Sequence, residues 1–96
     1  MNRDHIIESI RKNLPEIKSQ FGTESIALFG SYAREENEAE SDIDILVKMK
    51  NPDFYQFMAL QRYFEKLLNN KVDLVRDGSH LSSRFFDIVR KDIIYV

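Results

Sequence analysis

The sequence predicts an α/β (α+β) fold, a small mixed β-sheet with helices packed against it. Three short runs have the apolar composition or the alternation of β-strands, and a stretch between the second and third has apolar residues at helical spacing. A chain of 96 residues lies near the lower edge of single-domain size, because a short chain buries a smaller fraction of its surface. We therefore expect residues 1–96 to form one domain without a separate substrate-binding lobe.

Two helical segments are predicted before the first strand. Over residues 4–13 isoleucines recur at helical spacing, and Asp4 is placed to cap the start of the helix. Pro15 cannot occupy a regular helix interior, so we expect a break there. A short second turn then follows and ends at Gly22.

The middle of the chain predicts two strands joined by a turn and a loop. Residues 25–29 form an apolar run closed by Gly30, which is typical of a buried strand. Residues 30–34 predict a tight turn into a brief helix, and residues 35–41 an acidic loop without periodicity. Alternation of apolar and polar residues predicts the second strand over 42–47.

The strongest helix prediction covers residues 53–68, where apolar side chains gather on one face. Residues 69–70 form the turn that follows, and residues 72–75 predict a third strand. A last helix is expected over 81–90, before a short apolar end at 93–96. The sequence contains no internal repeat, low-complexity segment or linker.

The composition argues against several classes of protein. The net charge is −2, with 14 basic and 16 acidic side chains spread along the chain, so direct binding of nucleic acid is not expected. The absence of cysteine excludes disulfides, thiolate zinc sites and cysteine nucleophiles. The polar N-terminus carries no signal peptide, and no apolar run approaches the roughly 20 residues of a membrane helix. These features predict a cytoplasmic location without membrane association.

Asp42 and Asp44 form the first candidate site. Side chains two positions apart on a strand point to the same face, while Ile43 and Ile45 point to the opposite one. Such a pair offers hard oxygen ligands that suit Mg²⁺, which completes its coordination with water and substrate phosphates. A lone pair of this kind is more often solvated charge, so its interpretation depends on the rest of the chain.

Gly30 and Ser31 supply such a context. A glycine after a buried strand lets backbone N–H groups approach an anion, and the start of the following helix favours negative charge. The Ser31 hydroxyl can donate to a phosphate oxygen. When a Gly-Ser pair stands alone, however, a turn residue followed by a helix cap is the better interpretation.

Asp73 is the third element. It stands between Val72 and Leu74 in a run that otherwise looks buried, and an unpaired buried charge is costly. Such an aspartate is usually neutralised by an ion pair, a hydrogen-bond network or a metal. Lys71 or Arg76 could be a structural partner, and for this residue alone the structural and functional interpretations have about equal weight.

Other conspicuous residues have simpler interpretations. His5 and His80 lack the spacing of metal ligands, so both are expected on the surface. Apolar residues over 85–89 and in the tail exceed what one helical stripe buries, so they either cover the sheet or contact another protein chain. The aromatic residues of the 53–68 helix are expected in the core rather than as a nucleobase platform: Phe54, Tyr55, Phe57, Tyr63 and Phe64.

A Gly-Ser turn after a strand, an acid pair on the next strand and a lone acid on a third strand form an ordered pattern. It resembles the nucleotidyltransferase superfamily that includes DNA polymerase β, kanamycin nucleotidyltransferase and poly(A) polymerase. Within that superfamily, residues 30–34 (GSYAR) and 41–47 (SDIDILV) are similar to minimal nucleotidyltransferase (MNT) proteins. Many of those are MntA-type antitoxins paired with a HEPN-domain ribonuclease. The resemblance covers essentially the whole chain and implies the nucleotidyltransferase fold.

The resemblance implies a role for each matching residue. Asp42 and Asp44 would bind two Mg²⁺ ions, and Asp73 would complete the second site and orient or deprotonate the attacking hydroxyl. Gly30 and Ser31 would hold the triphosphate of ATP, the substrate that the resemblance favours. One metal would then hold the triphosphate while the other lowers the pKa of the acceptor hydroxyl.

Arg34 and the residue after it need separate treatment. Arg34 could donate to the phosphates, or it could pair with Glu35, Glu38 or Asp42 instead. The family often has glycine after this arginine, and this chain has Glu35, which could alter the loop and adds negative charge near the triphosphate site.

The favoured function is an enzyme that transfers AMP from ATP to a hydroxyl of a protein partner. The resemblance names the HEPN ribonuclease toxin as that partner, and the chain as its antitoxin. The alternative is a non-catalytic antitoxin that masks its partner sterically, although the three aspartates argue against it. Modification of an antibiotic or an RNA end is weakened by the missing second lobe and the absent basic field.

Overall fold

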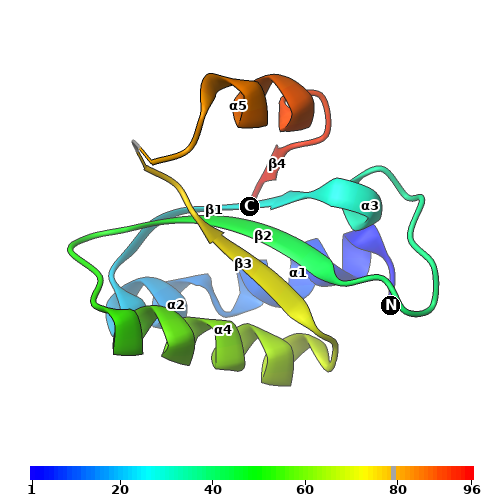
Figure 1. The fold of residues 1–96 in the computed structure, drawn as a ribbon. Helices are drawn as coiled ribbons and strands as arrows, with labels where there is room; N and C mark the ends of the chain where they lie inside the picture. The colour runs from blue at the N-terminus through cyan, green and yellow to red at the C-terminus, as the bar shows by residue number, and fades with distance from the viewer. Residues whose placement is uncertain (79) are drawn as a thin grey trace.

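A mixed sheet of four strands organises the computed structural model, which describes residues 1–78 and 80–96. The order across the sheet is β3 (Val72–Arg76), β2 (Ile43–Met49), β1 (Thr23–Phe29) and β4 (Ile94–Tyr95). β2 runs antiparallel to β1 and parallel to β3, and β4 pairs antiparallel with β1 (Figure 1). The predicted fold class, a small mixed sheet with helices against it, is confirmed.

Helices cover both faces of this sheet unequally. The helices α1 (Arg3–Lys12), α2 (Leu14–Phe21) and α4 (Phe54–Leu68) lie together on one face, which we call the three-helix face (Figure 1). The short α5 (Ser83–Val89) lies over the other, which we call the α5 face. The main core fills the space under the three-helix face, and the smaller cluster lies under α5.

The main core is built from the apolar side chains whose spacing in the sequence predicts the helices and strands. Fully buried side chains come from α1, from alternate positions of β2 and from the inner side of α4. Alternation along β2 sends one set of side chains into this core and the other set toward α5. The largest fully buried side chains of the core include Ile6, Ile10, Ile17, Ile43, Ile45, Leu60 and Phe64.

The helix ends follow the local chemistry, with two corrections. α1 is capped by Asn2, whose side chain accepts from the backbone N–H of His5, so the prediction of Asp4 as the cap is wrong. The break between the first helices falls at Asn13, and Pro15 lies in the first turn of α2, where its missing N–H has no partner to lose. Gly22 ends α2 in the left-handed conformation, as predicted.

The remaining elements agree with the sequence except at the C-terminus. α3 (Gly30–Ala33) is the predicted brief helix, and Asp53 caps α4 by accepting from the backbone N–H of Gln56. The predicted last helix over 81–90 is shorter, because Ser82 caps it. The apolar end forms β4, a strand that the sequence pattern did not identify, since two residues are too few to show alternation.

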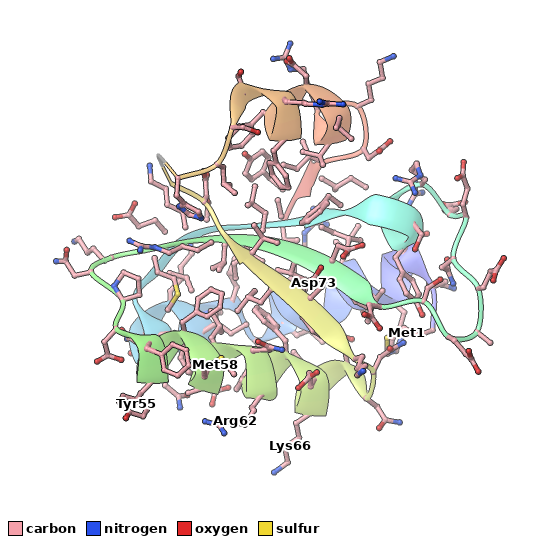
Figure 2. The ribbon with its side chains drawn as sticks, viewed as in Figure 1. Met1, Tyr55, Met58, Arg62, Lys66 and Asp73 are labelled. Atoms are coloured by element: carbon pink, nitrogen blue, oxygen red, sulfur yellow. The ribbon has the colours of Figure 1, made fainter. Side chains whose placement is uncertain are left out.

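The aromatic side chains of α4 are only partly in the core. Phe64 is fully buried and Phe57 and Tyr63 pack against the core, but Phe54 and Tyr55 are 71% and 80% exposed. The prediction that these aromatic side chains lie in the core is therefore wrong for Phe54 and Tyr55. They are the first two residues of α4 and come before the positions that face the sheet. Figure 2 shows Tyr55, Met58, Arg62 and Lys66 on the side of α4 that points away from the sheet.

The residues near the C-terminus mostly cover the sheet. Phe85, Phe86 and Val89 of α5 belong to the cluster on the α5 face, whereas Ile88 is exposed. His5 and His80 are both exposed, as predicted. Within the part of the chain that the structure describes, no helix is both long and apolar enough to cross a membrane.

Candidate active site

The strand register brings the candidate residues to one end of the sheet. Asp44 pairs with Phe29, the last residue of β1, and on its other side with Asp73 of β3. Gly30 follows Phe29 directly and begins α3. The antiparallel pairing places the end of β1 beside the start of β2, and the parallel pairing places the start of β3 there too. Residues separate in sequence therefore meet at a single point.

Alternation along β2 separates the acids from the core. Ile43 and Ile45 are fully buried on the three-helix face, as the sequence predicts. Asp44 lies between them and is half-buried, on the α5 face that it shares with Leu46. Asp42 is exposed and immediately precedes the strand. The chemistry of the site is thus confined to one face of the sheet.

Asp44 and Asp73 are directly adjacent on neighbouring strands. Burial, the negative charge of Asp73, a hydrogen bond with Asp73 and the charge of Asp42, in that order of size, together raise the pKa of the Asp44 carboxyl to about 6. The charged form of Asp44 is therefore disfavoured here, and a nearby positive charge would stabilise it.

Gly30 makes this arrangement possible. Its φ of +77° lies in the left-handed region, which residues with a side chain rarely adopt. A Cβ on this residue would overlap the carboxylate of Asp44. The backbone of the turn and the carboxylate can therefore approach each other only because position 30 is a glycine. Ser31 follows in the single turn of α3 and is half-buried.

Asp73 differs from expectation in its environment. It is exposed, whereas its neighbours Val72 and Leu74 are buried, so the run is not buried throughout. Among residues 1–78 and 80–96, neither Lys71 nor Arg76 forms an ion pair with it. Figure 2 shows Asp73 on β3, the strand at the sheet edge. The structural explanation by a neighbouring cation is therefore wrong.

Arg34 is held by partners that the sequence did not identify. Its Nη1 lies 3.1 Å from Asp92 Oδ2, and its Nε lies 3.3 Å from Glu36 Oε2. These bonds raise the pKa of the guanidinium, and the charge of Arg34 slightly lowers the pKa of Asp44. The expected pairs with Glu35, Glu38 or Asp42 do not occur within the described residues. Asp92 lies 58 positions away, and no local pattern could reveal the contact.

Glu35 occupies a position that suits glycine. Its φ is +61°, in the left-handed region, where glycine is unstrained and a residue with a side chain is not. The side chain forms an ion pair with Arg3 of α1, with Nη2 and Oε1 2.6 Å apart. This pair turns the carboxylate toward α1 and fixes the loop that leads to Asp42.

The donor set suits a divalent cation in its chemistry. As the side chains stand, no group of three or more His, Asp or Glu residues within 1–78 and 80–96 is arranged to hold a metal. Asp44 and Asp73 are nevertheless paired on neighbouring strands, and the negative charges of Asp73 and Asp42 both act on the Asp44 carboxyl. A hard cation that takes one or two carboxylates and several waters or phosphates would offset this repulsion. The residues therefore fit Mg²⁺.

A cavity of about 670 Å³ lies elsewhere, between the N-terminus, the acidic loop and the end of α4. The three aspartates are not among its lining residues, and Tyr32, which faces the main core, is. The cavity therefore belongs to the three-helix side of the molecule. The strand register brings Asp44 and Asp73 together away from this cavity.

Comparisons with known proteins identify the family of this chain. The family model described as "Polymerase beta, Nucleotidyltransferase" matches residues 7–95. The chain is 40% identical over 92 residues to the protein adenylyltransferase MntA of Thermococcus cleftensis, covering 94% of this chain and 92% of that protein.

Two solved structures share the fold. One is a toxin–antitoxin crystal structure with AMP-PNP, with a TM-score of 0.68 and 29% identity, covering 99% of this chain and 72% of that chain. The other is a tri-AMPylated HEPN toxin in complex with an MNT antitoxin from Shewanella oneidensis, with a TM-score of 0.58 and 28% identity. This similarity covers 98% of the present chain and 67% of the other.

Proposed function

This chain belongs to the polymerase β nucleotidyltransferase family and is a nucleotidyltransferase, and from this premise we propose that it transfers AMP from ATP to a hydroxyl group of a protein. The proposed acceptor is a HEPN-domain ribonuclease toxin, which would make the chain an antitoxin. The observation that carries the proposal is the meeting of Gly30, Asp44 and Asp73 at one end of the sheet.

We assign Asp42, Asp44 and Asp73 as the ligands of Mg²⁺, with two ions in the proposed site. Bound Mg²⁺ would neutralise the carboxylates and the triphosphate and lower the pKa of the acceptor hydroxyl. The raised pKa of Asp44 supports this assignment, because burial and the negative charges of Asp73 and Asp42 disfavour the charged form of its carboxyl, and a bound cation would offset this. The exposure of Asp42 and Asp73 leaves both open to a nucleotide.

The turn after β1 is assigned to the triphosphate. Gly30 leaves the backbone N–H groups of the turn accessible, and the Ser31 hydroxyl can donate to a phosphate oxygen. α3 is a single turn, so the helix dipole adds little and individual N–H donors do the binding. Arg34 lies close enough to act on the charge of Asp44, and it would contact phosphate on release from Glu36 or Asp92.

The proposed step is an in-line displacement. The acceptor oxygen forms a bond to the α-phosphorus of ATP, the bond from that phosphorus to the bridging oxygen breaks, and pyrophosphate leaves. The hydroxyl proton passes to the Asp73 carboxylate, which is exposed and can release it to solvent. Positioning and charge neutralisation supply most of the rate enhancement in such a reaction.

The choice of acceptor rests on the relatives. One is named a protein adenylyltransferase, and one solved neighbour is described as a tri-AMPylated HEPN toxin with its MNT antitoxin.

Label transfer tests this function. The purified chain is incubated with Mg²⁺, ATP labelled at the α-phosphate and a lysate of its own cells, beside an Asp42→Asn/Asp44→Asn double variant. We expect a labelled protein band, absent with the double variant, whose mass identifies the acceptor. If the unmodified chain and the double variant bind and inhibit a HEPN ribonuclease equally well, and neither labels it, steric masking would be established instead.

A further inference from the structure

β3 combines two properties that are rarely found together. It carries Asp73, and it is the edge strand of the sheet (Figure 1). An edge strand has a row of backbone N–H and C=O groups that point away from the sheet and can pair with another strand. Which of these groups are already occupied follows from the hydrogen bonds around β3.

The register defines the direction of each backbone group. The N–H of Ile43 donates to the carbonyl of Lys71, and the N–H of Asp77 donates to the carbonyl of Val47, so Lys71 and Asp77 face β2. Because directions alternate along a strand, Asp73 and Val75 also face β2. The backbone groups of Val72, Leu74 and Arg76 therefore point outward.

The outward groups are not all free. At Val72 the side chain of Glu65 accepts from the N–H at 3.2 Å, and the side chain of Gln61 donates to the carbonyl, also at 3.2 Å. Both side chains come from α4 and close the first part of the edge. For Leu74 and Arg76, no hydrogen bond to the outward groups is found within residues 1–78 and 80–96. The edge is closed at its start and open beyond it.

We infer that the open edge at Leu74 and Arg76 binds an extended segment of the acceptor protein by strand addition. This inference deepens the proposed function and rests on it. Neighbouring strands lie about 4.8 Å apart, so a side chain of the added strand on the α5 face lies next to Asp73. Pairing stops at Val72, which places the acceptor hydroxyl at the end of the paired stretch, beside the carboxylate that takes its proton.

Charge complementarity defines the chemistry of that segment. Lys71 and Arg76 are exposed at the two ends of β3 and form no ion pair within the described residues. A segment with acidic residues on either side of its hydroxyl-bearing residue would complement both cations. Backbone pairing provides the affinity in this mode of recognition, and side chains provide the selectivity.

Substitution at Arg76 tests the inference. Arg76→Pro removes an outward N–H without breaking a bond to β2, which is where proline is tolerated in a sheet. Arg76→Gln keeps the N–H and removes only the charge. We expect the KM for the acceptor protein to rise about tenfold or more with proline and about two- to threefold with glutamine. Both variants should bind Mg²⁺ and ATP as the unmodified chain does. Equal effects of the two substitutions, or none, would overturn the inference.

Amide hydrogen exchange provides a second test that requires no turnover. The Asp44→Asn variant is mixed with the acceptor protein, and exchange is followed at single residues. We expect slower exchange of the Leu74 and Arg76 amides in the complex and little change at Val72, whose amide is already bonded to Glu65. A complex in which the Leu74 and Arg76 amides exchange as fast as in the free chain would contradict strand addition. Slower exchange of these amides in a concentrated solution of the chain without the acceptor would also contradict it, because the edge would then pair two copies of this chain.

The two proposals fail in different ways. If the proposed function is wrong, the unmodified chain labels no protein at all. If only strand addition is wrong, the unmodified chain labels the acceptor and Arg76→Pro labels it no less well than Arg76→Gln does.

Discussion

Asp44 and Ile45 are consecutive residues of β2, yet they contribute to the protein in opposite ways. Ile45 is fully buried among apolar side chains on the three-helix face, where each buried methylene adds to stability. Asp44 lies on the other face, partly buried beside two further aspartates, and its charged form is disfavoured there. The comparison shows that alternate side chains of one strand stabilise the core on one face of the sheet and form the candidate site on the other.

The difference between the two faces also explains how so short a chain can tolerate a cluster of acids that destabilises the fold. A chain of 96 residues has a limited core, and here most of it lies under α1, α2 and α4, away from the acids. The α5 face has a smaller cluster, which includes Phe29, the residue paired with Asp44. Repulsion between the acids therefore acts on a part of the sheet whose other face is fully packed.

The largest expected effect concerns activity on the acid side. Asp44→Asn removes a charge that the proposed Mg²⁺ site needs, so AMP transfer should fall by about 100-fold or more. The measurement is label transfer at saturating ATP, with Asp87→Asn as the control. Asp87 is an exposed aspartate of α5 that pairs with Arg90, and its variant should transfer normally. Asp44→Asn at more than a tenth of normal activity would remove Asp44 from the site.

The matching change on the core side should affect stability instead. Ile45→Ala leaves a cavity among fully packed side chains and should lower the free energy of unfolding by roughly 2–5 kcal/mol. Ile45→Val should cost about 1 kcal/mol. Urea denaturation measures both. A loss below about 1 kcal/mol for alanine would show that the three-helix face is packed more loosely than described.

These two residues also show what a sequence can reveal. Alternation along 42–47 predicts which side chains are buried and which are not, because the period of a strand is a local property. The adjacency of Asp44 and Asp73 depends on the parallel pairing of β2 with β3, which no local pattern specifies. The pattern of Gly-Ser, paired acids and a later acid predicts a site only through its resemblance to a family. The contact of Arg34 with Asp92 and the strand β4 lie beyond both kinds of evidence.

The third prediction uses pH to separate the two faces. The pKa of Asp44 is raised from 3.8 to about 6, so between about pH 4 and pH 6 the folded chain holds more protons than the unfolded chain. Without metal, the free energy of unfolding should therefore fall as pH rises through this window and change little from this group above it. The fall should be about 1 kcal/mol, because solvent screens a partly exposed carboxyl.

Asp44→Asn isolates this contribution from other titrating groups. Denaturation in EDTA at pH 4 and pH 7 should show a larger decrease in stability for the unmodified chain than for the variant. Ile45→Val, which leaves the acids unchanged, should show the same pH dependence as the unmodified chain. Identical pH profiles for the unmodified chain and Asp44→Asn would mean that the acids do not strain the fold.

The smallest expected effect concerns Glu35, in the loop between α3 and β2. Glu35 has a φ of +61°, which costs a residue with a side chain about 1 kcal/mol more than glycine. Glu35→Gly and Glu35→Ala both lose the ion pair with Arg3, but only glycine relieves the backbone. The glycine variant should therefore be more stable than the alanine variant by about 1 kcal/mol in thermal unfolding, less the entropy that glycine adds to the unfolded chain. An alanine variant of equal or greater stability would refute the backbone strain.

The most direct test of the separation between the two faces is one set of thermal unfolding curves for the unmodified chain and Asp44→Asn, with and without Mg²⁺ and a non-hydrolysable ATP analogue. In EDTA the variant should unfold at the higher temperature, because it lacks the repulsion. With Mg²⁺ and the analogue at about 100 times the dissociation constant, the unmodified chain should gain about 2.7 kcal/mol and exceed the variant, which gains little. An equal gain for both proteins would contradict the assignment of Asp44 to the metal and nucleotide site.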